Sequence, residues 1–177
     1  MSNPPSTFKE WQNYPATLDP VHVAWLKNAK KTKTAFAVAD IEGVEISHKR
    51  FLTGVLLFSK KIAIYSPEQN VGLLLPSSGG GAIASMAILA LGKTIVNLNF
   101  TAGKKALKSA AEQAEVKSIY TSRKFLDKMA ERGINLESFF PNSKLLMLED
   151  IKEEISTLAR LITLLKAIIM PTNLIRK

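Results

Sequence analysis

Apolar and polar residues follow one another in blocks along the middle of the chain, and these blocks predict one βαβ unit. An apolar run, Val71–Leu75, ends at a turn made of Pro76, two serines and three glycines. Residues Ala82–Leu91 then have helical length and composition, and a second apolar run, Thr94–Leu98, follows Gly92. Strands that are apolar on both faces are typical of a parallel sheet covered by helices on each side.

The predicted helix Ala82–Leu91 has almost no polar face, because Ser85 is its only polar residue. A helix that is apolar all round is normally buried on all sides. The sheet covers one of these sides. We therefore expect the cover on the other side to come from another domain or from a partner.

The segment before this unit is predicted to form a small hairpin and a long helix. Ala35–Asp40 and Val44–Ser47 flank a Glu-Gly pair, as the two strands of a hairpin do. Ser47 can cap a helix that runs to about Tyr65, where Ser66-Pro67 stops it. The apolar side of that helix is predicted to comprise Phe51, Leu52, Val55, Leu56, Phe58 and Ile62.

The segment after the unit continues the alternation of helix and strand. The predicted elements are a helix from Thr101 to about Val116, a strand Lys117–Thr121, a helix Arg123–Arg132 capped by Ser122 and ended by Gly133, and a strand Lys144–Leu148. In the first helix a small apolar face is expected to lie on the sheet; it comprises Ala106, Leu107, Ala110, Ala111 and Ala114. The order β-α-β-α-β-α-β predicts a doubly wound α/β fold with a mostly parallel sheet and helices on both faces.

These patterns divide the chain into three segments: a lead-in (1–34), an α/β subdomain (35–150) and a helical tail (151–177). The lead-in is polar and holds four of the eight prolines, so we expect it to be irregular apart from one short helix, Val21–Lys30. Trp11, Tyr14 and Trp25 indicate that it packs against another part of the protein.

The tail is predicted to be one amphipathic helix that leads toward a downstream region. Its apolar side comprises Ile151, Ile155, Leu158, Ile162, Leu165 and Ile169, and its opposite side Ser156, Arg160, Thr163 and Lys166. Two interpretations stay open: the helix lies on an anionic membrane surface, or it folds onto a domain outside these 177 residues.

Composition narrows the class of protein. The chain has 177 residues and 19.4 kDa, enough for one domain with its own core. It has no cysteine, which excludes disulfides and thiol catalysis and favours a reducing compartment. With 24 Lys and Arg against 15 Asp and Glu, the formal charge is +9, which favours an anionic partner. We find no signal-peptide pattern and no apolar run of the roughly 18–20 residues that span a membrane.

The glycine turn resembles a dinucleotide fingerprint, since Gly79, Gly81 and Ala84 fit G-x-G-x-x-G/A between a strand and a helix. The acidic residue expected about 20 positions later is missing, and the next strand ends instead in Asn97 and Asn99. We therefore favour a role for the glycines in a tight turn and close helix–sheet packing.

Other candidate motifs are incomplete. Gly92-Lys93-Thr94 resembles the end of a phosphate-binding loop, but Ala87 replaces its first glycine and a strand follows. His22 and His48 lack metal-ligand spacing, and neither starts the His-x-x-x-x-Asp acyltransferase pattern, because Lys27 and Thr53 occupy the fifth following positions.

The polar pairs near the predicted strand ends are expected to have structural roles rather than catalytic ones. Glu149-Asp150 is expected to cap the next helix, and Ser77-Ser78 to form a turn, since no base accompanies these serines. Basic residues are not interleaved with exposed aromatics as in nucleic-acid binders. No catalytic, cofactor-binding or metal-binding set is predicted from these residues.

The stretch from Val71 to Lys128, VGLLLPSSGGGAIASMAILALGKTIVNLNFTAGKKALKSAAEQAEVKSIYTSRKFLDK, resembles the amino-terminal part of adenylate-forming enzymes, the acyl- and aryl-CoA synthetase superfamily. The preceding DIEGVEISHKRFLTGVLLFSKKI resembles the entry hairpin and first helix of that superfamily. LNFTAG, VKSIYTSRKFLDK and Leu148-Glu149-Asp150 resemble the acyl-acyl carrier protein synthetase part of bacterial 2-acylglycerophosphoethanolamine acyltransferase/synthetase proteins.

The resemblance implies a Rossmann-like amino-terminal subdomain of a ligase. Fatty acid, ATP and magnesium would give an acyl-adenylate and pyrophosphate, and the acyl group would then pass to acyl carrier protein and onward to a lysophospholipid. It also implies a bacterial cytoplasmic protein, with the inner face of the inner membrane as one location.

The active-site motifs of the family lie downstream of this region: the nucleotide loop ending in Pro-Lys-Gly, the magnesium motif and the catalytic lysine. No active-site residue is therefore carried over to this sequence. We expect the 177 residues alone to be inactive and to bind neither ATP nor magnesium; the alternative is a free-standing α/β module that binds an anionic ligand or protein.

Overall fold

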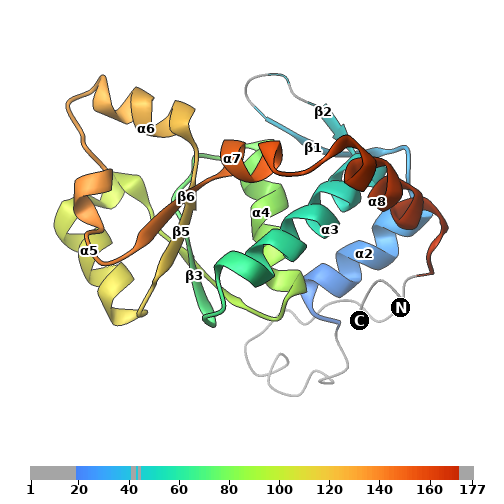
Figure 1. Ribbon diagram of the computed structural model, residues 1–177, viewed down its shortest axis with the longest axis horizontal. Coiled ribbons are helices and arrows are strands. Elements are labelled where there is room, and N and C mark those ends of the chain that lie inside the picture. Colours follow the sequence, from blue (N-terminus) through green and yellow to red (C-terminus); the bar gives the residue numbers. More distant parts are fainter. Residues whose placement is uncertain (1–18, 41–42, 44, 172–177) are drawn as a thin grey trace, which may run out of the picture.

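The computed structural model describes residues 19–40, 43 and 45–171. A four-stranded parallel sheet lies in the middle of the molecule, with helices on both of its faces (Figure 1). The strands are β3 (Asn70–Leu73), β4 (Thr94–Asn97), β5 (Ser118–Thr121) and β6 (Lys144–Met147). They are short because each apolar run is bounded closely by a turn or a helix cap.

The strand order is β4-β3-β5-β6, so the chain winds first in one direction from β3 and then in the other. Gly72 of β3 lies in register with Val96 of β4 and with Ile119 of β5. Right-handed crossovers in opposite directions place the connecting helices on opposite faces of the sheet. The predicted doubly wound fold is confirmed.

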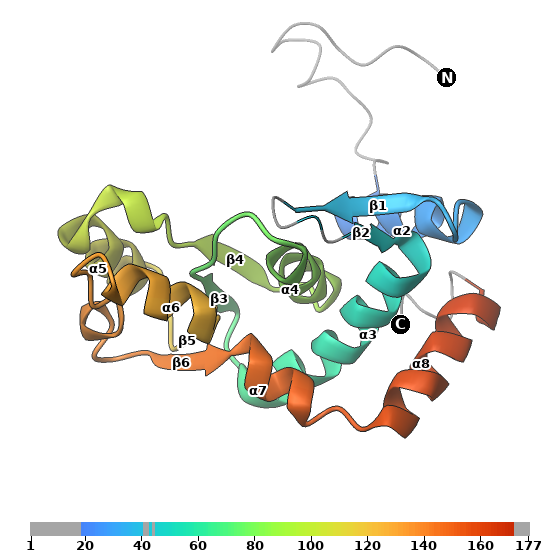
Figure 2. The ribbon, with the colours of Figure 1, turned by 90° about the horizontal axis from the view of Figure 1, so that it is seen from above.

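Each face of the sheet has its own core. Helices α3 (His48–Tyr65) and α4 (Gly79–Ala90) cover one face, and α5 (Lys104–Gln113) and α6 (Arg123–Ala130) cover the other (Figures 1 and 2). In α5 only part of the predicted small face is buried: Leu107 and Ala111 lie inside, whereas Ala106 and Ala110 are exposed. A short 3₁₀ turn, Phe100–Ala102, precedes α5, and Gly103 with φ +80° joins them, so the helix starts later than predicted.

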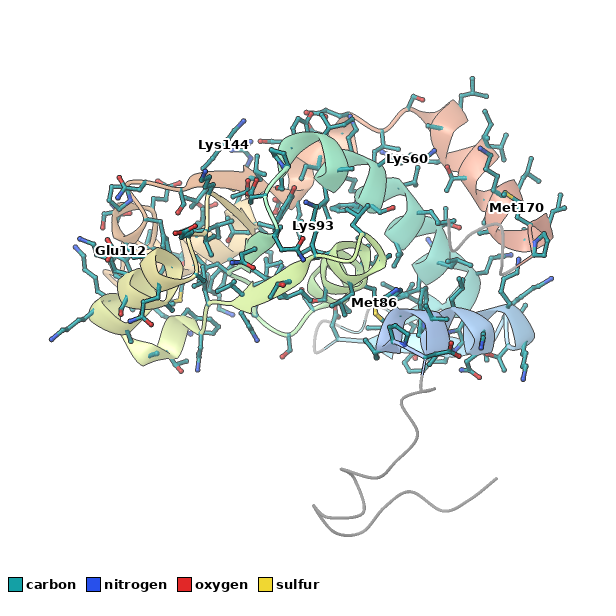
Figure 3. All side chains as sticks on the ribbon, turned by 90° about the horizontal axis from the view of Figure 1, so that it is seen from below. Lys60, Met86, Lys93, Glu112, Lys144 and Met170 are labelled. Carbon is teal, nitrogen blue, oxygen red and sulfur yellow. The ribbon has the colours of Figure 1, made fainter. Side chains whose placement is uncertain are left out.

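Helix α4 is covered by this chain itself, so the prediction that its outer cover comes from another domain or a partner is wrong. Its outer side lies against α3, the hairpin of β1 (Phe36–Ala39) and β2 (Glu45–Ser47), and α2 (Val21–Lys31). Met86 points from α4 toward α2 (Figure 3). Trp25 of α2 packs edge-on against Phe51 of α3, with ring centroids 5.0 Å apart, as expected for an aromatic residue that anchors the lead-in. Trp11 and Tyr14 lie outside the described residues.

The paired strands of the hairpin and the helix that follows them agree with the sequence except for one cap; Glu42 of the predicted turn and Val44 of the predicted strand lie outside the described residues. Strands β1 and β2 pair antiparallel, and Ser47 occupies the N-cap position of α3. However, the Ser47 side chain makes no cap hydrogen bond. The start of α3 is instead tied to the hairpin end by the His48 and Lys49 amides, which donate to the Ala35 and Lys33 carbonyls.

The tail is two helices rather than one: α7 (Leu148–Glu153) and α8 (Thr157–Ile169), with Ser156 capping α8 through the Ala159 amide. The contacts of α8 within this chain are made by its small residues and not by its aliphatic side. Thr163 and Ala167 are its buried residues, whereas Leu158, Leu161, Ile162, Leu165 and Ile169 are exposed. Lys30 of α2 donates to the carbonyls of Ala167 and Ile168 at the end of α8. Helix α8 therefore packs on α3 and α2 through small residues and leaves its aliphatic side exposed. It lies at the edge of the molecule, beside α3 (Figure 2).

The buried phenol of Tyr120 leads to a prediction on alkaline stability. Its hydroxyl lies 2.8 Å from Ser66 Oγ, and burial raises the pKa of Tyr120 from 10.0 to about 12. A raised pKa means that the folded state holds the proton more tightly than the unfolded state. This contribution is fully present below about pH 10 and is lost as the pH rises through about 12. We expect the free energy of unfolding of the wild type to fall more steeply over this interval than that of Tyr120→Phe, measured by denaturant titration; parallel curves would contradict this.

Candidate functional site

The carboxyl edge of the sheet is where the topology places a ligand site. In a doubly wound sheet, ligands bind outside the carboxyl ends of the strands at the point where the winding direction changes. Here that point lies between β3 and β5, followed by the Pro76–Ser78 turn and by Ser122. Ser78 Oγ accepts from the Gly81 amide at 3.1 Å, and Ser122 Oγ accepts from the Phe125 amide at 3.1 Å. The helices that follow β3 and β5, α4 and α6, are thus capped by serine side chains.

A cavity of about 890 Å³ opens at this edge between α3, α4, α7 and α8. Its walls are mainly apolar and include Leu57, Phe58, Leu75, Ile83, Leu161 and Leu164. Three cationic residues, Arg50, Lys152 and Arg160, also line it, together with Glu149. The volume lies within the roughly 300–1,000 Å³ of pockets that hold a whole small ligand. An elongated apolar molecule with an anionic group suits such walls.

A second, smaller cavity of about 240 Å³ lies on the other side of the two capping serines. Ser78 and Ser122 line both cavities, so the two meet at the carboxyl ends of β3 and β5. The small cavity has a different chemistry, with Lys124, Lys128 and Arg132 in its wall.

The glycine turn is arranged for close packing. A methyl group at Gly79 would lie 2.8 Å from Ile46 Cδ1 of the hairpin, and one at Gly81 would lie 3.2 Å from Ser78 Oγ. The three glycines form the first turn of α4, which begins three residues earlier than predicted. The Gly79 amide donates to the Asp40 carboxylate at 3.3 Å, so a carboxylate of the chain lies where a dinucleotide pyrophosphate would bind. This geometry supports the packing interpretation of the G-x-G-x-x-A pattern.

Glu149 and Asp150 lie in the first turn of α7 and bind the start of α6. Glu149 Oε1 accepts from the Arg123 amide at 3.1 Å, and Asp150 pairs with the Arg123 guanidinium, which raises the pKa of Arg123. Glu149 Oε2 is buried and has no hydrogen-bond partner among the described residues. The pair was predicted to cap the helix that follows it; its hydrogen bonds instead hold α6 to α7, across the end of the sheet.

The remaining candidate residues are not brought together. Lys93 donates to the carbonyls of Pro67 and Glu68 at the amino-terminal edge of the sheet, far along the strands from the glycine turn (Figure 3). His22 lies on α2, and His48 is the first residue of α3. Ser77 lines the small cavity, and Asn99 caps the 3₁₀ turn before α5. No base accompanies Ser77 or Ser78 in the hydrogen bonds of the described part of the chain.

Metal-ligand clusters and membrane-spanning helices are both absent from the described residues. Within residues 19–40, 43 and 45–171, no group of three or more His, Cys, Asp or Glu side chains could hold a metal ion. The sequence also lacks the nucleotide-binding loop ending in Pro-Lys-Gly that is typical of the family it resembles. Among the same residues, none of the helices combines the length and hydrophobicity that crossing a membrane requires.

No family model matches this chain, but its structure has clear neighbours. The o-succinylbenzoate CoA synthetase MenE of Bacillus subtilis, bound to its acyl-adenylate intermediate, superposes with a TM-score of 0.59 at 16% identity, over 73% of this chain and 32% of that one. The amino-terminal subdomain of NpsA from Klebsiella oxytoca gives 0.59 at 10%, over 77% and 33%. The fold is that of the amino-terminal subdomain of adenylate-forming enzymes. A third neighbour, the amide bond synthetase McbA of Marinactinospora thermotolerans, gives 0.57 at 17%, over 72% and 25%, so this chain spans about a quarter to a third of these neighbours.

Two features of the site could not be found from the sequence patterns. Arg160, which the sequence places on the polar side of the tail, is exposed, lines the large cavity and donates to the Lys152 carbonyl at 2.7 Å. Arg50, Thr53 and Gly54 line the cavity from α3, about 100 residues away in sequence from α8. The only local signal was a basic residue at the edge of an otherwise apolar helix, which is common on solvated surfaces as well.

Proposed function

We propose that this chain is the amino-terminal part of an ATP-dependent acyl-activating ligase. The observation that carries the proposal is a cavity of about 890 Å³, apolar with a few cations, at the carboxyl edge of a sheet with the fold of adenylate-forming enzymes. The apolar walls suit the hydrocarbon part of a carboxylic acid, and Arg50, Lys152 and Arg160 suit its carboxylate. MenE has also been solved with ATP and a magnesium ion, which supports these cofactors for the complete ligase.

The proposed reaction has two steps. A fatty-acid carboxylate oxygen attacks the α-phosphorus of ATP, forming the acyl-adenylate and releasing pyrophosphate. A thiolate of acyl carrier protein then attacks the acyl carbon, forming the thioester and releasing AMP. Transfer onward to a lysophospholipid, in the bacterial cytoplasm or at the inner face of the inner membrane, is the most specific form of the proposal. Its support is the resemblance of VKSIYTSRKFLDK and of Leu148-Glu149-Asp150 to that branch, together with a charge of +9 that suits an acidic carrier protein.

In this scheme the chain binds and orients the acid, and the rest of the polypeptide supplies the chemistry. Adenylation requires cationic groups placed on the phosphates as charge develops in the transition state. The described residues hold no magnesium cluster, and the sequence holds no Pro-Lys-Gly loop. The surface made by the exposed side of α8 would be covered by the remaining domain or by a membrane.

Pyrophosphate release tests the proposal. We expect no release above a blank from the 177-residue chain with fatty acid, ATP and magnesium. The complete product of the coding sequence that contains this chain is expected to release pyrophosphate in a fatty-acid-dependent way, and to form the thioester when acyl carrier protein is added. Turnover by the 177 residues would contradict the assigned division of labour. A complete product that never activates fatty acids would exclude the ligase.

A free-standing α/β module that binds an anionic ligand is the second candidate. The basic wall of the small cavity and the +9 charge favour it. A coding sequence that stops at Lys177 supports this candidate, and one that continues into a Ser/Thr/Gly-rich loop ending in Pro-Lys-Gly supports the ligase.

A further inference from the structure

We propose that the small cavity beside α6 binds a phosphate group, a site separate from the acid-binding cavity. The inference rests on the described residues around the cavity and holds for either candidate function. Its wall combines cations, hydroxyls and aromatic rings contributed by the turn after β3, the 3₁₀ turn before α5, and α6.

The cations come from α6 and from the turn that follows it. Lys124 and Lys128 lie one helical turn apart on α6, Arg132 lies just after the end of the helix, and all three line the cavity. Asp127 and Glu131 belong to a neighbouring face of α6 and are not among the lining residues. Arg123, which pairs with Asp150, is also absent from the lining residues.

One carboxylate shares the cavity with these cations. Asp40 is the only acidic residue among the described lining residues, and its Oδ2 already accepts the Gly79 amide at the start of α4. Lys124, like Asp40, already has an interaction partner, so the proposal rests on Lys128 and Arg132. A net positive, partly enclosed wall favours an anion, and the dianionic phosphate group more than a carboxylate.

Polar and apolar lining groups fit the two ends of a phosphate ester. Ser77 and Ser122 place hydroxyl groups in the wall, and the amino-terminal ends of α4 and α6 point their positive dipole ends toward the same edge. Phe100 and Phe125, whose rings meet edge-on at 4.9 Å, form an apolar side together with Met129. The volume of about 240 Å³ lies below that of pockets for whole ligands, which suits the terminal phosphate of a larger molecule.

The test measures the binding of inorganic phosphate by the 177-residue chain at low ionic strength. Binding is detected as a change in the ³¹P line width of the phosphate. We expect saturable binding by the wild type and at least about ten-fold weaker binding by the double variant Lys128→Gln/Arg132→Gln, because two charge-assisted contacts are removed. The matched control is Lys60→Gln/Lys105→Gln, which changes the net charge equally at exposed positions that line neither cavity and should alter affinity less than about two-fold. Circular dichroism verifies that both variants are folded.

Equal loss in the two double variants, or the absence of saturable binding to the wild type, would overturn the proposal. AMP serves as the second probe. If AMP displaces inorganic phosphate from the wild type, the phosphate belongs to a nucleotide-type ester; if it does not, the site takes free phosphate or a smaller ester. Loss of fatty-acid activation in the complete protein has no bearing on this binding measurement, so the two proposals fail independently.

Discussion

Ile62→Ala is expected to lower the free energy of unfolding by about 2–5 kcal/mol, since it removes a fully buried side chain from the core between α3, α4 and the sheet. Ile62 has 0% exposure and lies against the strands at the carboxyl-terminal part of α3. The neighbouring helices and the sheet hold this space open from both sides, so a cavity would remain after the substitution. Urea or guanidinium unfolding of the purified chain measures the change.

The same helix provides a matched control two residues away. Ile64 is 70% exposed, so Ile64→Ala should change the free energy of unfolding by less than about 0.5 kcal/mol. Both substitutions remove the same atoms and have the same effect on helix propensity. Equal destabilisation by the two variants would show that the α3 face assigned to the core is wrong.

Gly72→Ala is expected to destabilise the chain by about 1–3 kcal/mol, the cost of overpacking in a close-packed core. Gly72 lies in β3 at the centre of the sheet, and a methyl group there would approach Ile119 Cγ1 to 2.8 Å and Val116 Cγ1 to 2.9 Å. The Ser118 carbonyl oxygen would be only 3.2 Å away, so the neighbouring strand has to shift as well. Denaturant unfolding gives the change in stability.

Gly80→Ala is the matched control for Gly72→Ala. It lies in the first turn of α4, where a methyl group meets only Leu148 Cδ1 at an ordinary 3.4 Å. Alanine is a better helix former than glycine by about 0.5–1 kcal/mol, so we expect this variant to be unchanged or more stable. If Gly72→Ala were as stable as Gly80→Ala, the tight contact of β3 with β5 would be refuted.

The elements and the fold class could be predicted because they depend on local patterns. Strands that are buried on both faces form continuous apolar runs, and Ser122 is recognisable from the sequence as the cap of α6. The cap of α4 by Ser78 was missed, because the glycines that follow it were interpreted as a turn. The alternation of these elements restricts the topology to a doubly wound sheet, because crossovers are right-handed and short. The prediction of one long tail helix failed because Ser156, which caps α8 and so interrupts the pattern, fits a polar position of a continuous helix equally well.

The candidate site could be predicted only in part. The glycine turn and the polar residues after β5 and β6 indicate where the carboxyl edge lies. Neither cavity could be foreseen, because each is formed by elements distant in the chain: α3 and α8 enclose the large one, and the turn after β3 and α6 enclose the small one. A residue pattern gives the faces of single elements but does not say which faces meet.

Helices α4 and α8 show most clearly what local pattern decides and what tertiary packing decides. The apolar residues of α4 require burial, and the sequence is sufficient to say so; that α2, α3 and the hairpin of this chain provide the cover depends on the path of the chain. In α8 the pattern identifies an aliphatic side and a mixed side, yet the helix packs on α3 through Thr163 and Ala167 and leaves the aliphatic side exposed. Local hydrophobicity sets how much apolar surface an element has, whereas the space left by its neighbours decides which surface can fit, and small residues allow the close approach of α8 to α3.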